Sequence, residues 1–218
     1  MAEDFWSPVG LSVRVAILSG IIVFIFGTLI ARLLARKKFR GQLFIETLII
    51  LPLVLPPSVV GFLLIVIFGK NSPGGRSIEW LFHQPVMFTW WAAVIASVVV
   101  AFPLMYQSAK TGFEGIDSDI ENAARVDGAN EWKVFIGVAL PLAAKSIVAG
   151  AILSFARALG EFGATLMFAG NIPEKTQTIP TAIYVAMDSG DMETAWMWVG
   201  MMVLISFAML MLVHLIKD

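Results

Sequence analysis

The strongest constraint on the fold of this chain is a series of long stretches that carry almost no charge. Seventeen uncharged residues separate Arg14 from Arg32, and 23 separate Glu46 from Lys70. About 20 apolar residues in a helix cross the roughly 30 Å hydrocarbon core of a bilayer. The sequence therefore predicts an all-α membrane protein with five transmembrane helices, in a single domain that covers residues 1–218. The expected spans are residues 10–34, 45–69, 87–109, 141–168 and 194–216.

The composition also indicates a chain that lies in lipid. Hydrophobic residues make up 58% of the chain and charged residues 14%, whereas soluble domains have roughly 45–50% and 25%. The net charge of −1 gives no basic face for nucleic acid, and the absence of cysteine excludes disulfides and thiol chemistry. Neither histidine belongs to a cluster of metal-ligating residues, so we expect no metal site. The acidic N-terminus differs from the basic start of a secretory signal, which favours a retained first span.

The positions of the basic residues predict the orientation of the chain. An odd number of spans places the two termini on opposite sides, and cytoplasmic segments are enriched in Lys and Arg. Ten basic residues lie on one predicted side: Arg32, Arg36, Lys37, Lys38, Arg40, Lys110, Arg125, Lys133, Lys145 and Lys217. Three lie on the other: Lys70, Arg76 and Lys175. We therefore expect the N-terminus outside, the C-terminus inside and the loop of residues 110–140 in the cytoplasm.

The second span contains several prolines at membrane depth. Pro52, Pro56 and Pro57 each remove a backbone donor, so this helix must kink or start late. Irregular backbone at this depth persists only where protein or a water-filled cavity covers it. A simple packing kink and the lining of a cavity are the two interpretations.

The predicted cytoplasmic loop contains signals for two short helices. Asp117 or Ser118 can cap the first, and Gly128 suits the left-handed position that follows a helix. Asn130 can cap the second. Two adjacent alanines on the first helix leave room for another protein to approach closely. Packing of the loop on its own bundle is the alternative interpretation.

The spacing in this loop resembles the signature of ABC importer permeases, which is E-A-A-x3-G-x9-I-x-L-P. Here N-A-A at 122–124 is followed after three residues by Gly128, and after nine more by V-A-L-P at 138–141. Asn122 stands where the family usually has Glu, and Glu121 lies one position earlier. The stretches LPLVLPPSVVGFLL, FARALGEFGATLMFAGNIP and TQTIPTAIY also look like molybdate permeases, so the resemblance extends over nearly the whole chain.

The resemblance implies a type I ABC importer permease fold, in which the loop forms a coupling helix that docks into a groove on the ATPase subunit. Carried over to this sequence, the ATPase-coupling residues are Glu121, Asn122, Ala123, Ala124, Asp127, Gly128 and Ala129. The candidate residues lining the pathway are Pro56, Pro57, Ser58 and Thr165.

The resemblance also implies partners and a location in the cell membrane. The expected partners are a second copy of the chain, two cytoplasmic ABC ATPase subunits and an extracytoplasmic molybdate-binding protein. Gly69-Lys70 is followed by Asn rather than Ser or Thr, so it is no phosphate-binding loop. We therefore expect no catalytic site and no cofactor here, with ATP bound by the partner ATPase.

The identity of the transported anion depends on one stretch. Sulfate permeases share much of ALGEFG and AGNIP, whereas TIPTAIY looks more like the molybdate type. Sulfate permeases also usually carry an extra N-terminal span. The resemblance therefore favours molybdate, with tungstate as a nearly isosteric competitor and sulfate or thiosulfate as alternatives.

Two ionisable residues interrupt the fourth predicted span. Arg157 and Glu161 are four apart, so on a continuous helix they share a face. Such residues usually pair with each other or mark a function. Mutual neutralisation, a link to the cytoplasmic gate and direct contact of Arg157 with the anion are the three interpretations.

Two other classes of protein remain as alternatives. A self-contained channel or secondary carrier would need no ATPase, and the cytoplasmic loop argues against it. An intramembrane enzyme would need a paired nucleophile and base, or a metal cluster, at membrane depth, and the sequence offers neither.

Overall fold

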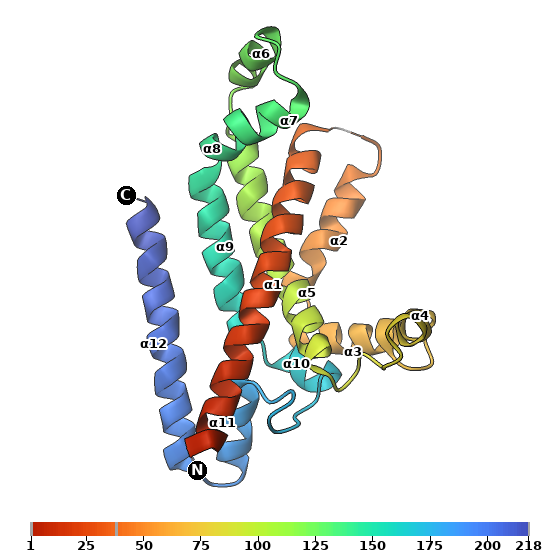
Figure 1. The fold of residues 1–218 in the computed structure, drawn as a ribbon, viewed down its shortest axis with the longest axis vertical. Helices are drawn as coiled ribbons and strands as arrows, with labels where there is room; N and C mark the ends of the chain where they lie inside the picture. The colour runs from red at the N-terminus through yellow and green to blue at the C-terminus, as the bar shows by residue number, and fades with distance from the viewer. Residues whose placement is uncertain (1, 38, 218) are drawn as a thin grey trace.

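The computed structural model of the chain describes residues 2–37 and 39–217, and in this part all regular elements are helices, with no strand. Figure 1 shows the arrangement of the elements. The helices are α1 (Ala2–Arg36), α2 (Gln42–Val54), α3 (Pro57–Phe68), α4 (Pro73–Phe82), α5 (Trp90–Glu114), α6 (Ser118–Val126), α7 (Glu131–Val134), α8 (Leu140–Leu142), α9 (Ala144–Leu159), α10 (Gly163–Phe168), α11 (Ile179–Asp188) and α12 (Met192–Lys217). A π-helical turn, Phe135–Ala139, joins α7 to α8.

Three helices form the centre of the bundle. Helices α1, α5 and α9 pack on one another, and α5 is the most buried of them. Small residues allow the close packing, because a Cβ on Gly27 would lie 2.7 Å from Cγ of Met105. Met105, Tyr106 and Phe113 of α5 are fully buried in the largest core cluster.

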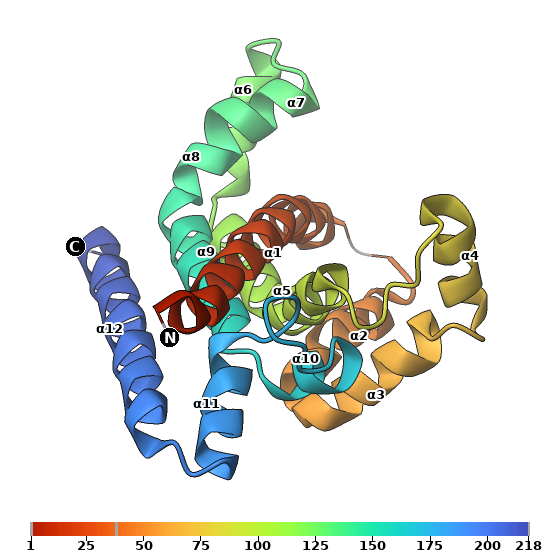
Figure 2. The same cartoon turned by 60° about the horizontal axis from the view of Figure 1, so that its bottom comes forward.

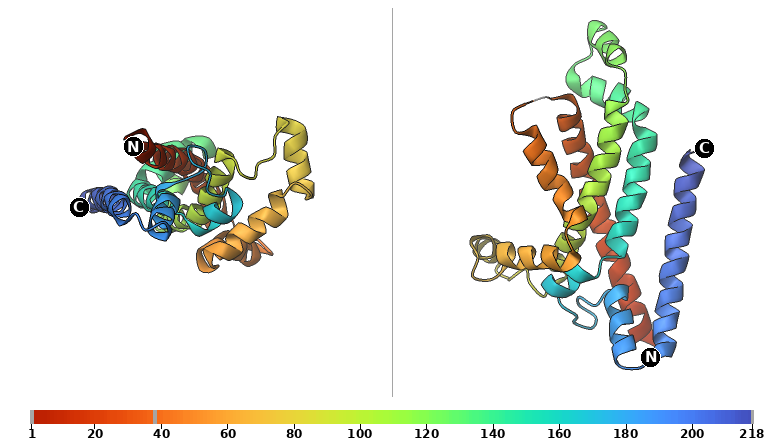
Figure 3. Two further views of the ribbon diagram at one scale, coloured as in Figure 1. Left: turned by 90° about the horizontal axis from the view of Figure 1, so that it is seen from below. Right: turned by 180° about the vertical axis from the view of Figure 1, so that it is seen from behind.

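Only some of the helices are long enough to cross a bilayer alone. In the described residues, α1, α5 and α12 are long and apolar enough, and two bent helix pairs raise the number to five if each pair is one span. The predicted first, third and fifth spans correspond to these three helices, each of which is longer than expected. Helix α1 begins and α12 ends toward opposite ends of the bundle (Figures 1 and 3).

The second predicted span is bent sharply. Helices α2 and α3 meet at an angle of 120° around Leu55 and Pro56, so the predicted kink is present. Pro57 occupies the first turn of α3, where its missing N–H breaks no helical hydrogen bond. Figure 3 shows α3 projecting sideways from the bundle, and residues 45–69 are therefore not one straight helix.

The fourth predicted span differs from expectation at both ends. Pro141 lies in α8, and a bend of 74° separates the segment Glu131–Leu142 from α9. Helix α9 ends at Leu159, and α10 starts only at Gly163. Residues 141–168 are therefore not one continuous helix, and the glycines at both edges of the break, Gly160 and Gly163, disfavour helix there.

The outer surface of the bundle is apolar. Large hydrophobic side chains are exposed along α1, α3 and α12, as for Phe26 (55%), Phe62 (56%) and Phe207 (64%). Figure 2 shows that α12 flanks the bundle on one side and that α3 and α4 extend from it on another. Apolar surface of this extent is typical of a chain that lipid or other subunits cover.

Candidate functional site

The loop predicted to be functional forms two short helices at one end of the bundle. Helices α6 and α7 lie beyond the ends of α1 and α5 (Figure 1), and we call this the loop end. The Asp117 carboxylate accepts the Asp119 N–H at 2.9 Å, and the Asn130 side chain accepts the Lys133 N–H at 2.9 Å. Both predicted caps are therefore present.

The turn between the two helices depends on glycine. Gly128 has a φ of +88°, in the left-handed region that the sequence predicted for it. The N–H of Ala129 donates to the carbonyl of Ala124 at 3.0 Å, which closes the end of α6. The turn at Gly128 and this hydrogen bond fix the direction in which the chain leaves α6 and continues to α7.

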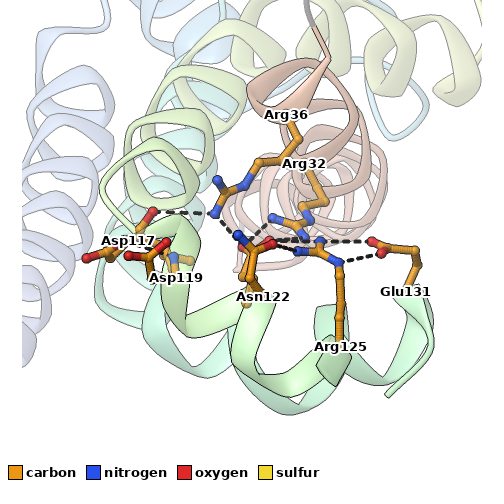
Figure 4. A network of polar contacts seen from close by, with 9 residues as sticks. Arg32, Arg36, Asp117, Asp119, Asn122, Arg125 and Glu131 are labelled. Carbon is orange, nitrogen blue, oxygen red and sulfur yellow. Dashed lines mark hydrogen bonds and ion pairs between the residues drawn. The ribbon is translucent and has the colours of Figure 1, made fainter. Parts of the chain in front are cut away.

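A buried carboxylate attaches α6 to the end of α1. The Glu121 side chain is 1% exposed and accepts two hydrogen bonds from Arg32, at 2.9 and 3.1 Å. Arg36 donates to it at 2.5 Å and Arg125 at 3.3 Å. Figure 4 shows the guanidinium groups of α1 and α6 converging at this point. The forked contact with Arg32 fixes both distance and orientation.

The arginines keep this carboxylate charged. Burial alone would raise the pKa of Glu121, but the hydrogen bonds from Arg32 and Arg36 outweigh it and hold the pKa below its usual range. The Arg32 guanidinium also lies 5.6 Å from the centre of the Phe113 ring. Helix α6 is therefore tied to α1, and through Arg32 to the end of α5, by contacts that persist at neutral pH.

The exposed surface of the loop end is small and partly apolar. Asn122, Ala123, Asp127 and Gly128 are exposed, while Ala124 and Ala129 are half-buried. Val126 is 86% exposed and Trp132 63% exposed beside them. Glu121, in contrast, faces the interior. Its side chain therefore offers a partner no surface, although it was predicted to be a coupling residue. Its partners lie 85 and 89 residues away, and only the folded chain reveals them.

The two intramembrane charges do pair, although not on one helix. Arg157 lies in the last turn of α9, and Glu161 lies in the break before α10. Their Nη1 and Oε2 atoms are 2.7 Å apart. The other oxygen of Glu161 accepts the N–H of Ala164 at 2.7 Å. Glu161 therefore neutralises Arg157 and also holds the start of α10.

The four candidate pathway residues do not form one open surface. Pro56, Pro57 and Ser58 are exposed at the bend between α2 and α3, whereas Thr165 is 1% exposed inside the chain. The two broken helices meet here, since a Cβ on Gly163 would lie 2.8 Å from Cβ of Pro57. In the described residues, no group of three or more metal-ligating side chains occurs.

The sequence is similar to transport proteins along nearly its whole length. Residues 16–217 match the family described as the binding-protein-dependent transport system inner membrane component. The chain is 64% identical over 213 residues to the putative molybdenum transport system permease protein YvgM of Bacillus subtilis (strain 168), covering 98% of this chain and 94% of the relative. It is 41% identical over 219 residues to ModB of Escherichia coli (strain K12), a molybdenum transport system permease protein. This match covers 100% of this chain and 94% of that relative.

A sulfate-related protein is less similar. The probable sulfate transport system permease protein cysT of Prototheca wickerhamii is 31% identical over 182 residues, covering 84% of this chain and 71% of that relative.

The fold is shared with a solved transporter. A chain of the bacterial alginate ABC transporter, solved in complex with an alginate pentasaccharide-bound periplasmic protein, superposes with a TM-score of 0.75 at 15% identity. The match covers 97% of this chain and 77% of that one. This likeness confirms the predicted helical fold.

Proposed function

Because the chain belongs to the family of binding-protein-dependent transport system inner membrane components, we propose that it is the permease subunit that carries molybdate across the membrane in an ATP-driven ABC importer. The observation that carries this proposal is the similarity, over almost the full chain, to two molybdenum permeases. Sulfate is the second candidate, and the lower similarity of the sulfate-related relative argues against it. Tungstate, which is nearly the size of molybdate, should compete.

The importer is proposed to contain two copies of this chain. Five spans enclose too little space for a hydrated dianion, whereas two copies would surround a path along a two-fold axis. A closed two-fold dimer is the commonest arrangement for identical subunits. The apolar and polar faces that the single chain leaves exposed are consistent with a further subunit.

The loop end is proposed to connect this path to ATP. Helices α6 and α7 present Asn122, Ala123 and Val126 at the tip of the bundle, where a groove on an ATPase subunit can receive them. When ATP closes two ATPase subunits, the two loops are drawn together and the path turns outward. An outer binding protein then delivers the anion, and hydrolysis resets the complex.

We expect reconstituted permease to import molybdate only together with its ATPase and binding protein. In proteoliposomes, ATP should drive uptake of labelled molybdate, and excess tungstate should suppress it because the two oxyanions nearly coincide in size and charge. Vesicles that lack the permease are the control. Uptake without ATPase would indicate a channel or carrier, and sulfate uptake that tungstate fails to inhibit would indicate the sulfate class.

We expect the loop end to face the cytoplasm, with five spans and the N-terminus outside. A cysteine in place of Ser72, in the turn before α4, should react from outside with an impermeant thiol reagent, since the natural chain has no cysteine. A cysteine in place of Ser118, at the start of α6, should react only after the membrane is opened. The reverse pattern of labelling would contradict the orientation.

A further inference from the structure

An open groove between α5 and α9 combines polar side chains that the sequence analysis did not connect. Its volume is about 450 Å³. Helix α5 contributes Gln107, Ser108 and Thr111, and α9 contributes Lys145 and Ser146. The groove begins near the loop end, where α5 approaches its end and α9 starts. Polar side chains within membrane-spanning helices are costly and usually face a water-filled cavity or another protein surface.

Two glycines bring the walls of the groove together. A Cβ on Gly112 would lie 2.7 Å from Cβ of Ser146, and a Cβ on Gly150 would lie 2.6 Å from Cβ of Ser108. The backbones of α5 and α9 can therefore approach closely, as small residues allow in membrane bundles. The hydroxyl-bearing residues are consequently placed along the seam between the two helices.

The groups that line the groove favour an anion. Hydroxyl and amide groups can donate hydrogen bonds, and the Lys145 ammonium adds a positive charge. No carboxylate lines the groove, and within residues 2–37 and 39–217 Lys145 makes no ion pair. An oxyanion would find donors and a positive charge here, whereas a cation would find repulsion.

The same side of α9 leads from the groove to the intramembrane arginine. Ser146, Ala149, Leu153 and Arg157 follow one another at intervals of three, four and four residues, which places them on one face of a helix. Ser146 and Arg157 are separated by about 16 Å along the axis. The Arg157 side chain is 28% exposed, and its Nη1 atom lies 2.7 Å from Oε2 of Glu161.

We infer that this face of α9, from Lys145 to Arg157, lines the path of the anion together with Ser108 and Thr111 of α5. The inference rests on the proposed function, since it names the residues that a tetrahedral oxyanion would pass. Lys145 lies at the mouth of the path and carries a positive charge that is unpaired in the described part of the chain. The partly exposed guanidinium of Arg157, which is paired with Glu161, offers hydrogen-bond donors deeper in the membrane. Neither position is a closed cage, as conduction requires weak contacts at several sites.

Thiol labelling tests the inference directly, because the natural chain has no cysteine. The test uses the assembled importer with Ser146→Cys in the groove and Val148→Cys as the matched control. Val148 is 36% exposed and lies about 200° around the helix from Ser146, so it should face lipid. Each variant is treated with two methanethiosulfonate reagents of similar size, one anionic and one cationic, and labelling is read on the permease chain.

Ser146→Cys should react with both reagents. The anionic reagent should react about threefold faster than its rate with a free thiol predicts, as expected for one positive charge at about 7 Å in water. Adding Lys145→Gln should remove most of this preference, and molybdate should slow the labelling. Val148→Cys should remain unlabelled. Failure of Ser146→Cys to react, or equal preference with and without Lys145, would overturn the inference.

The proposed function is measured separately in the same preparations. Uptake of molybdate by the unsubstituted importer tests the function, whereas the labelling pattern tests the path. If molybdate uptake is absent but the labelling pattern is as expected, the path is retained for a different anion. If molybdate uptake is normal but Ser146→Cys does not react, the proposed function stands and this face of α9 does not line the path.

Discussion

Replacing Ala123 with tryptophan is expected to abolish ATP-driven molybdate uptake while the permease still folds and inserts. Ala123 is exposed on α6, so a larger side chain meets no part of its own chain. The indole would instead occupy the space that the ATPase groove needs. A clash of about 3 kcal/mol, at the upper end of overpacking costs, weakens association by about 100-fold.

Co-purification of the ATPase with the variant measures this loss, alongside uptake. Ala123→Ser is the matched control, since it adds only one oxygen at the same site and should retain both association and uptake. If Ala123→Trp imports molybdate at the unsubstituted rate, then α6 does not contact the ATPase and the coupling role of the loop fails.

Replacing Glu121 with alanine is expected to detach α6 from α1. Among the described residues of the loop, Glu121 has the only buried carboxylate. Its removal leaves Arg32, which faces the end of α5, without its partner. Breaking a buried pair costs about 3 kcal/mol when one charge stays behind. The cost should not exceed this value, because Arg36 and Arg125 are about one-third exposed and can be hydrated once the carboxylate is removed.

Thermal unfolding in detergent and limited proteolysis of residues 115–130 measure this effect. Glu131→Ala is the control, because Glu131 is 73% exposed and also contacts Arg125, and solvent screens an exposed pair so that its loss changes stability little. Glu121→Ala should lower the unfolding temperature and expose the loop to protease, while Glu131→Ala should do neither. Equal behaviour of the two variants would show that Glu121 does not hold the loop.

The parts of the structure that follow local rules could be predicted from the sequence. Asp117 and Asn130 cap helices through bonds to residues two or three positions away, and Gly128 adopts the positive φ that the end of α6 requires. Proline predicted the bend between α2 and α3 in the same way, although not its angle of 120°.

The parts that depend on distant residues could not be predicted. Gly160 and Gly163 permit the break after Leu159, but the hydropathy of residues 141–168 gives no sign of it. The close approach of Gly163 to Pro57 joins residues far apart in the sequence. The role of Glu121 depends on arginines of α1, and the groove depends on close approach of α5 to α9. A single sequence does not reveal such long-range pairs.

The distance along the chain between Arg32 and Glu121 has a consequence for biosynthesis. Arg32 and Arg36 are made 89 and 85 residues before the carboxylate that later binds them. During synthesis from the N-terminus, they therefore reach the insertion machinery as unpaired positive charges, which in the proposed orientation would help to retain the first connection in the cytoplasm. Once residue 121 has been added, the same guanidinium groups become the anchor of α6. In the proposed orientation, the two arginines that hold the finished loop would thus have directed insertion first.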